Sequence, residues 1–284
     1  MSVEALHRQP VILLGASNLT IGWRHLLRAL QATVQGPIDL QVALGMGRSY
    51  VDTSSFWFRG LPGIVHCGLW NNLPLQDSQP PLVLITDVGN DIVYGHKPQI
   101  IVDAVAECVR RIRSRRPDSQ IVITGLPIAS LESVQRLQFL VARTALFPVC
   151  FLSLTEILQN ALSIDAGIRQ LAGQLQIPYV IPEAGWYGKD PIHVLRHLRE
   201  PVFRKFFSHW RTRDDGSYPT TPDLANGTRP HPGRAILDDG LHPTTLDLAA
   251  SVPLPSSASR TVCWIKRRTA QPVFDSDELR VSAW

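Results

Sequence analysis

Ser17 stands where a side chain could act as a nucleophile. It follows the apolar residues 11–14 and a small turn of Gly15 and Ala16, and a stretch with helical spacing comes after it. A buried parallel strand presents a side chain in this way at the carboxyl edge of a sheet, where open α/β sheets bind their ligands. The pattern therefore predicts that Ser17 lies at a ligand-binding edge.

A serine hydroxyl is a weak nucleophile at neutral pH, so it needs a neighbouring base, and the base needs a group that orients it. His193 can be that base, and Asp190, three residues earlier, can accept the Nδ1–H of the imidazole. Both follow the apolar residues 178–181, a predicted strand. We therefore expect the pair to leave the sheet at the same edge as Ser17.

Asp239 and His242 have the same spacing and form an alternative pair. The context favours His193, which lies between a predicted strand and a well-patterned helix. Asp239 instead follows a stretch rich in proline and glycine. If His242 were the base, residues 190–238 would be an insertion near the site.

Acyl transfer also needs donors aimed at the oxyanion that develops on the substrate carbonyl. Three donors are available: the backbone N–H of Ser17, the backbone N–H of Gly47 and the side-chain amide of Asn90. Gly47 follows a second predicted strand and Asn90 follows a third. Because glycine lacks a Cβ, the backbone of Gly47 can approach a substrate closely.

Four short segments in this order resemble the blocks of the SGNH hydrolases, a group within the GDSL esterase/lipase superfamily. They are Gly15-Ala16-Ser17-Asn18, Gly45-Met46-Gly47, Gly89-Asn90-Asp91 and Asp190-Pro191-Ile192-His193. The resemblance covers residues from about 10 to 210. Ala16 stands where the family usually has an aspartate that supports the loop, and Asp239-Gly240-Leu241-His242-Pro243 is closer to the usual last block.

The resemblance implies a flavodoxin-like three-layer α/β/α sandwich with a parallel five-stranded sheet. It also implies ester hydrolysis through an acyl-enzyme on Ser17, with no metal and no cofactor. Asp190 and His193 would complete a catalytic triad, and Gly47 and Asn90 would belong to the oxyanion hole. A catalytically silent scaffold that binds a small ligand or a protein is the alternative, and a nucleotide or phosphate binder is a weaker one.

The alternation of apolar runs with helical patterns indicates βαβ units and a doubly wound sheet over residues 10–210. We expect strands at 10–14, 38–44, 82–87, 120–124 and 178–181, and helices at 19–34, 100–112, 131–146, 154–175 and 194–210. The sequence predicts a domain over residues 1–211. Residues 212–284 are predicted to be a loosely ordered extension, because much of this segment is rich in proline, glycine and serine.

The composition and charge of the chain indicate which classes of partner to expect. The chain has 284 residues, 44% of them hydrophobic, and a net charge of +4. No apolar run approaches the ~20 residues of a membrane span, and residues 1–10 do not resemble a secretory signal, so we expect a cytoplasmic protein. The basic run 110–116 has no interleaved aromatics, which argues against nucleic acid. We expect a small-molecule ester as substrate; short-chain esters, acetylated sugars, lysophospholipids and thioesters all remain open.

Overall fold

The computed structural model describes residues 8–56, 59–73, 79–134, 150–210 and 272–284. A seven-stranded sheet runs through the molecule in the order β7-β6-β5-β1-β2-β9-β8. Its strands are β1 (Gln9–Leu14), β2 (Ile38–Ala43), β5 (Leu82–Ile85), β6 (Gln120–Thr124), β7 (Tyr179–Val180), β8 (Pro272–Asp275) and β9 (Leu279–Ala283). β3 (Ser54–Phe56) and β4 (Arg59–Leu61) form a separate antiparallel pair.

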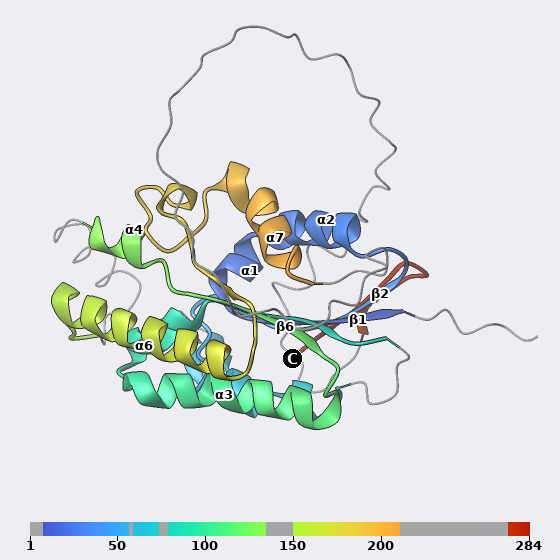
Figure 1. Cartoon of the computed structure of the whole chain (residues 1–284), viewed down its shortest axis with the longest axis horizontal. Helices are drawn as coiled ribbons and strands as arrows, with labels where there is room; N and C mark the ends of the chain where they lie inside the picture. The colour runs from blue at the N-terminus through green and yellow to red at the C-terminus, as the bar shows by residue number, and fades with distance from the viewer. Residues whose placement is uncertain (1–7, 57–58, 74–78, 135–149, 211–271) are drawn as a thin grey trace, which may run out of the picture.

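Helices cover both faces of this sheet (Figure 1). α2 (Trp23–Thr33) and α7 (Arg199–Phe207) pack together on one face, and α3 (Pro98–Arg115) and α6 (Leu154–Gln174) pack together on the other. The short helices are α1 (Ser17–Ile21) and α4 (Ile128–Glu132). The three-layer α/β/α sandwich predicted from the sequence is therefore confirmed. None of the described helices is long and apolar enough to cross a membrane.

Two hydrophobic clusters, one on each side of the sheet, make up the core. Along β1, Val11 and Leu13 belong to the cluster under α2 and α7, while Ile12 and Leu14 belong to the cluster under α3 and α6. Successive side chains of a strand point to opposite faces, so a strand covered on both faces is apolar throughout. This arrangement explains the uninterrupted apolar runs that mark β1 and β5 in the sequence.

The five strands that the sequence predicted are present, and β1, β2, β5, β6 and β7 pair in parallel. In order along the sheet they read as the second, first, third, fourth and fifth strands of the chain, which is the flavodoxin-like order. The chain passes from β1 to β2 on one side of β1 and then crosses to β5 on the other side. The switch point of the sheet therefore lies between β1 and β5. Ligand sites of doubly wound folds lie at the carboxyl ends of the strands at this switch point.

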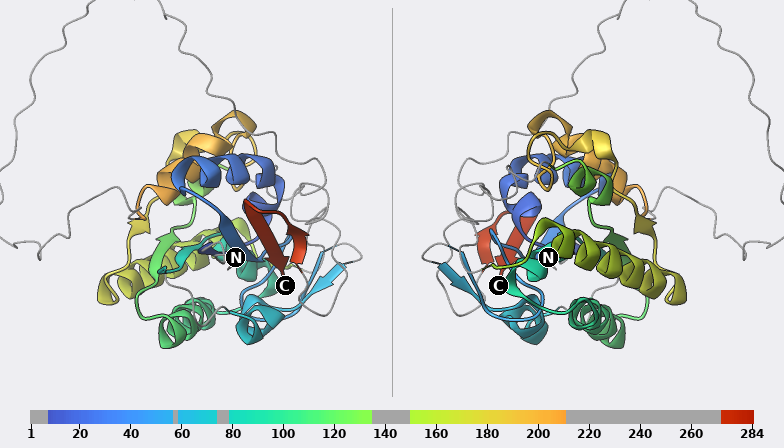
Figure 2. Two further views of the ribbon diagram at one scale, coloured as in Figure 1. Left: turned by 90° about the vertical axis from the view of Figure 1, so that its right-hand side faces the viewer. Right: turned by 90° about the vertical axis from the view of Figure 1, so that its left-hand side faces the viewer.

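The sheet has seven strands rather than the predicted five. β9 pairs in parallel with β2, and β8, which precedes β9 in the chain, pairs with β9 in the antiparallel direction. Figure 2 shows these last strands, in red, beside the strands from the start of the chain. Residues 272–284 are thus part of the sheet and not of a loose extension. The remaining residues of the predicted extension, up to 271, lie outside the described residues.

A helix predicted over residues 19–34 is divided in two. α1 ends at Ile21 and α2 begins at Trp23, with Gly22 between them. A Cβ atom on Gly22 would lie 2.8 Å from Cε2 of Phe203, so the close approach of α7 requires glycine here. The predicted helix over 131–146 falls almost entirely outside the described residues.

Candidate active site

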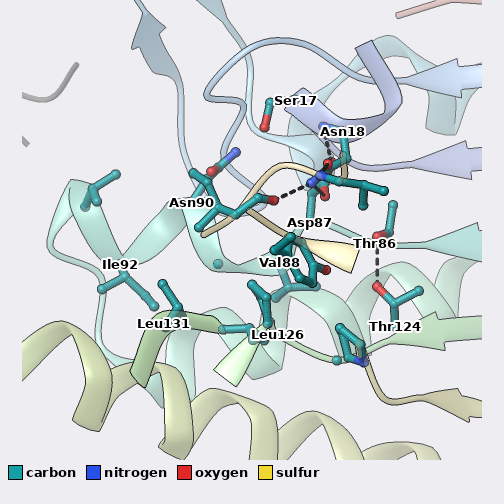
Figure 3. A pocket seen from close by; sticks show the side chains of 18 of the residues that line it. Ser17, Asn18, Thr86, Asp87, Val88, Asn90, Ile92, Thr124, Leu126 and Leu131 are labelled. Atoms are coloured by element: carbon teal, nitrogen blue, oxygen red, sulfur yellow. Dashed lines mark hydrogen bonds between the residues drawn. The ribbon is translucent and has the colours of Figure 1, made fainter. Parts of the chain in front are cut away.

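Ser17 is the first residue of α1, directly beyond the carboxyl end of β1. It is buried, with 6% of its surface exposed. Asn90 follows β5 in the 3-10 helix η3 (Val88–Tyr94). Both side chains line one pocket, and Figure 3 shows them at the same end of it. The structure therefore brings these two predicted residues together at the switch point.

Asp87 holds the loop that carries Ser17. Its Oδ2 accepts hydrogen bonds from the backbone N–H groups of Ala16, at 3.0 Å, and Asn18, at 2.9 Å, while Oδ1 accepts from Nδ2 of Asn18 at 2.9 Å. Asp87 adopts a left-handed backbone conformation with φ of 59°. A carboxylate from the end of β5 thus supports the loop, where the sequence block has Ala16 instead of aspartate.

The backbone N–H of Ser17 has no acceptor among the described residues, although the N–H groups on either side of it both bind Asp87. The N–H of Gly47 likewise has no acceptor in the described part of the chain. Gly47 has φ of +62°, which favours glycine, and its carbonyl accepts a 2.6 Å hydrogen bond from the hydroxyl of Tyr94. Both amides are therefore available to an anionic oxygen.

The side-chain amide of Asn90 makes one long hydrogen bond, 3.3 Å from Nδ2 to the carbonyl of Arg48. This contact ties Asn90 to the loop of Gly47, because Arg48 is the next residue. The second hydrogen of the amide has no acceptor among the described residues. A carbonyl oxygen held between Asn90 and the two backbone amides would gain up to three donors.

Asp190 and His193 contact each other within one loop. Nδ1 of His193 lies 2.6 Å from Oδ2 of Asp190, and Oδ1 of Asp190 accepts from the backbone N–H groups of Ile192 and His193. Burial would raise the pKa of Asp190, but the hydrogen bond and charge of His193, with the two backbone donors, hold this pKa below its ordinary value. The carboxylate is therefore ionised at neutral pH and can orient the imidazole.

The opposite nitrogen of His193, Nε2, is buried and has no hydrogen-bond partner in the described part of the chain. The Ser17 hydroxyl and this nitrogen are not hydrogen-bonded to each other. In unliganded enzymes such contacts are commonly long and tighten when substrate binds. A buried imidazole nitrogen without a partner is nonetheless a costly arrangement that a proton-transfer role would explain.

Asn18 connects the two loops. Its Nδ2 donates to the carbonyl of Ile192 at 2.9 Å, and its Oδ1 accepts from the N–H of Val194 at 2.9 Å. The residue after Ser17 therefore binds the backbone on both sides of His193. Sequence reasoning missed this role, because the partners lie 174 and 176 residues away. An amide directly after the serine was the one signal that could have suggested it.

The pocket beside Ser17 has a volume of about 140 Å³ and is lined mostly by apolar side chains. Figure 3 places Ser17 and Asn18 at one end and Leu126 and Leu131 at the other. Ile192 and Val194 from the histidine loop also line it, whereas His193 and Gly47 do not. The alternative pair, Asp239 and His242, lies outside the described residues.

No model of a protein family matches the chain, and no curated protein matches it. Solved structures do match. A carbohydrate acetylesterase from Sinorhizobium meliloti, Est24, is 12% identical, with 70% of this chain and 97% of that chain covered and a TM-score of 0.47. An aryl esterase of M. smegmatis is 14% identical, with 70% and 97% covered and a TM-score of 0.45.

A putative GDSL-like lipase from Parabacteroides merdae is 12% identical, with 72% of this chain and 97% of that chain covered and a TM-score of 0.46. Another solved structure, 14% identical, reaches a TM-score of 0.50 over 71% of this chain and 96% of its own. At these identities the likeness concerns the fold alone. In strand order and in the arrangement of their layers, the described residues have the fold of an SGNH hydrolase.

Proposed function

We propose that the protein is a serine esterase that hydrolyses carboxylic esters through an acyl-enzyme on Ser17. The observation that carries the proposal is the state of His193. Its Nδ1 is held by Asp190 at 2.6 Å, its Nε2 is buried without a partner in the described part of the chain, and its loop is bound to the residue after Ser17. An imidazole oriented in this way and left without a partner is suited to take a proton from a nearby hydroxyl.

In the first half-reaction, Oγ of Ser17 attacks the ester carbonyl carbon while its proton moves to Nε2 of His193. The negative charge on the carbonyl oxygen is stabilised by the N–H groups of Ser17 and Gly47 and by the amide of Asn90. The tetrahedral intermediate then expels the alcohol, which receives the proton from His193. Ser17 is left as an ester of the acyl group.

In the second half-reaction, His193 takes a proton from a water molecule that attacks the acyl-enzyme. The intermediate collapses, the proton passes to Oγ of Ser17 and the carboxylic acid leaves. Asp190 stabilises the positive charge on the imidazole in both halves. Asn18 and Asp87 act as positioning residues in this scheme, because they hold the loops of His193 and Ser17 without contacting the reacting atoms.

Labelling with a fluorophosphonate tests whether Ser17 is an activated nucleophile. The wild type should be labelled on the peptide that contains Ser17, and Ser17→Ala should not be labelled. Ser163→Ala is the control, because Ser163 is an exposed serine of α6. A folded wild-type protein that resists the probe would overturn the proposal and favour the alternative, a catalytically silent scaffold.

A further inference from the structure

The pocket beside Ser17 offers a ligand few polar groups. Apart from Tyr187, six polar side chains line it, and four of them bind one another or the protein backbone. Asn18 uses its amide on Asp87, Ile192 and Val194, and Asp87 accepts three hydrogen bonds from the serine loop. The hydroxyls of Thr86 and Thr124 lie 2.8 Å apart and bind each other.

Ser17 and Asn90 are the other two, and both belong to the reacting end of the pocket. Tyr187 adds a hydroxyl to the lining. Burial, and to a smaller extent the charge of Asp87, raises the pKa of this hydroxyl well above its ordinary value. Tyr187 therefore stays neutral. Apart from this hydroxyl, the rest of the pocket offers few partners to a polar or charged ligand group that loses its water, and such a loss is unfavourable.

The far end of the pocket is apolar and fixed. Val88, Ile92, Leu126 and Ile157 are all buried and belong to the core cluster under α3 and α6, and Leu131 packs against that cluster. Walls that are part of the core keep their shape. The volume of about 140 Å³ is close to that of an engineered apolar cavity of ~150 Å³ that binds benzene.

The position of His193 decides which part of an ester can enter. The oxygen of the leaving alcohol must come within hydrogen-bond reach of Nε2, and His193 does not line the pocket. Ser17 and Asn90, which would hold the acyl carbonyl, do line it. A group that extends from the carbonyl carbon into the pocket therefore belongs to the acyl side.

We infer that this pocket is an acyl site for apolar groups of about the size of a benzene ring, such as butanoyl, hexanoyl and benzoyl groups. The inference rests on the proposed function. It selects apolar acyl esters over acetylated sugars among the substrates that the sequence leaves open. Leu131 and Leu126 form the end of the pocket and limit the length of the acyl group.

Hydrolysis of p-nitrophenyl acetate, butyrate, hexanoate, benzoate and decanoate tests the acyl site with a constant leaving group. The value of kcat/KM should rise about fourfold for each methylene that fits and should fall from hexanoate to decanoate. A second series with a constant acetyl group and alcohols of increasing length should be nearly flat. A flat acyl series, or chain-length dependence only in the alcohol, would overturn the inference.

Leu131→Trp should lower kcat/KM for hexanoate and benzoate about tenfold or more relative to kcat/KM for acetate, because the larger ring fills the part of the pocket that the longer acyl groups need. Leu171→Trp is the matched control: Leu171 is another half-buried leucine that packs against the same core but does not line the pocket. Leu131→Ala should move the optimum to longer chains. An unchanged acyl preference in both Leu131 variants would contradict the inference.

Failure of the acyl site and failure of the proposed function are distinguishable. If only the acyl site is wrong, acetate hydrolysis remains, depends on Ser17 and shows no preference for longer acyl groups. If the proposed function is wrong, none of these esters is hydrolysed and Ser17 does not react with a fluorophosphonate.

Discussion

At the residue scale, the proposed chemistry depends on how a few polar groups are held. Asp87 has a left-handed backbone and accepts three hydrogen bonds from the serine loop. Asn18 then extends this network to the histidine loop. Neither residue is a reacting group in the proposed mechanism. Both set the geometry between a nucleophile and a base that lie far apart in the chain.

Replacing Asn18 by alanine should lower kcat about 100-fold and change KM little, because a small misplacement of His193 relative to Ser17 is costly. Asn18→Asp should be similarly impaired, since it loses both N–H donors and places a second carboxylate beside Asp87. Asn72→Ala is the control, because Asn72 is an exposed asparagine with one backbone hydrogen bond. Steady-state kinetics and the melting temperature are the measurements.

Equal loss of kcat in Asn18→Ala and Asn72→Ala would contradict the positioning role of Asn18. A KM effect with unchanged kcat would also contradict it, because that pattern indicates lost substrate binding rather than lost alignment.

At the scale of elements, the loop after β2 presents a backbone amide that the mechanism needs. Gly47 has φ of +62° and Gly36 has φ of +84°. A residue with a Cβ is strained by about 1–2 kcal/mol in this conformation. Gly36 lies between α2 and β2, and a Cβ there would meet no atom within 4 Å. A side chain would therefore strain the backbone similarly at both glycines, but only Gly47 lies in the loop that the proposed mechanism uses.

Gly47→Ala and Gly36→Ala should each lower the free energy of unfolding by about 1 kcal/mol. Only Gly47→Ala should also lower kcat, by about 10-fold to 100-fold, because the amide at the oxyanion moves. Denaturant unfolding and ester hydrolysis separate the two effects. If kcat falls equally in both variants, the loss reflects general destabilisation and Gly47 has no oxyanion role.

Apolar runs and helical periodicity were enough to predict most elements. The strand over 120–124 has its predicted limits, and the helix predicted over 154–175 begins as predicted and ends one residue earlier, at Gln174. The break at Gly22 was not predicted, and the residue that packs against Gly22, Phe203, is distant in sequence. The same reason hid the role of Asn18, whereas Ser17, Gly47, Asn90, Asp190 and His193 were visible as local motifs.

At the scale of the whole molecule, the end of the chain helps to build the sheet. β9 pairs with β2, and Arg280 of β9 binds the buried carboxylate of Asp39 through two hydrogen bonds. The buried Arg48, beside Gly47, donates from Nη1 to the carbonyl of Trp284 at 2.6 Å. The residue that follows β9 therefore contacts the loop of Gly47, the proposed oxyanion donor.

The sequence did not predict these strands. Residues 272–284 follow a long segment rich in proline, glycine and serine, and a short strand that pairs with a partner more than 200 residues away leaves little local pattern. The buried Asp39 and the half-buried Arg280 can be recognised as partners only in the folded structure.

Arg280→Ala should lower the free energy of unfolding by about 1–3 kcal/mol, because it leaves the Asp39 carboxylate buried with fewer partners. Arg110→Ala is the control; Arg110 pairs with Glu107 on the surface of α3, where water screens an ion pair and it contributes little to stability. Chemical denaturation measures both. Equal stability of the two variants would contradict the docking of β9 on β2.

The most direct test of the account is hydrolysis of p-nitrophenyl acetate by the wild type, Ser17→Ala, His193→Ala and His242→Ala, measured side by side. We predict that Ser17→Ala and His193→Ala lose at least about 10³-fold in kcat and that His242→Ala stays near the wild type. Loss in His242→Ala with full activity in His193→Ala would contradict the account and assign the base to His242.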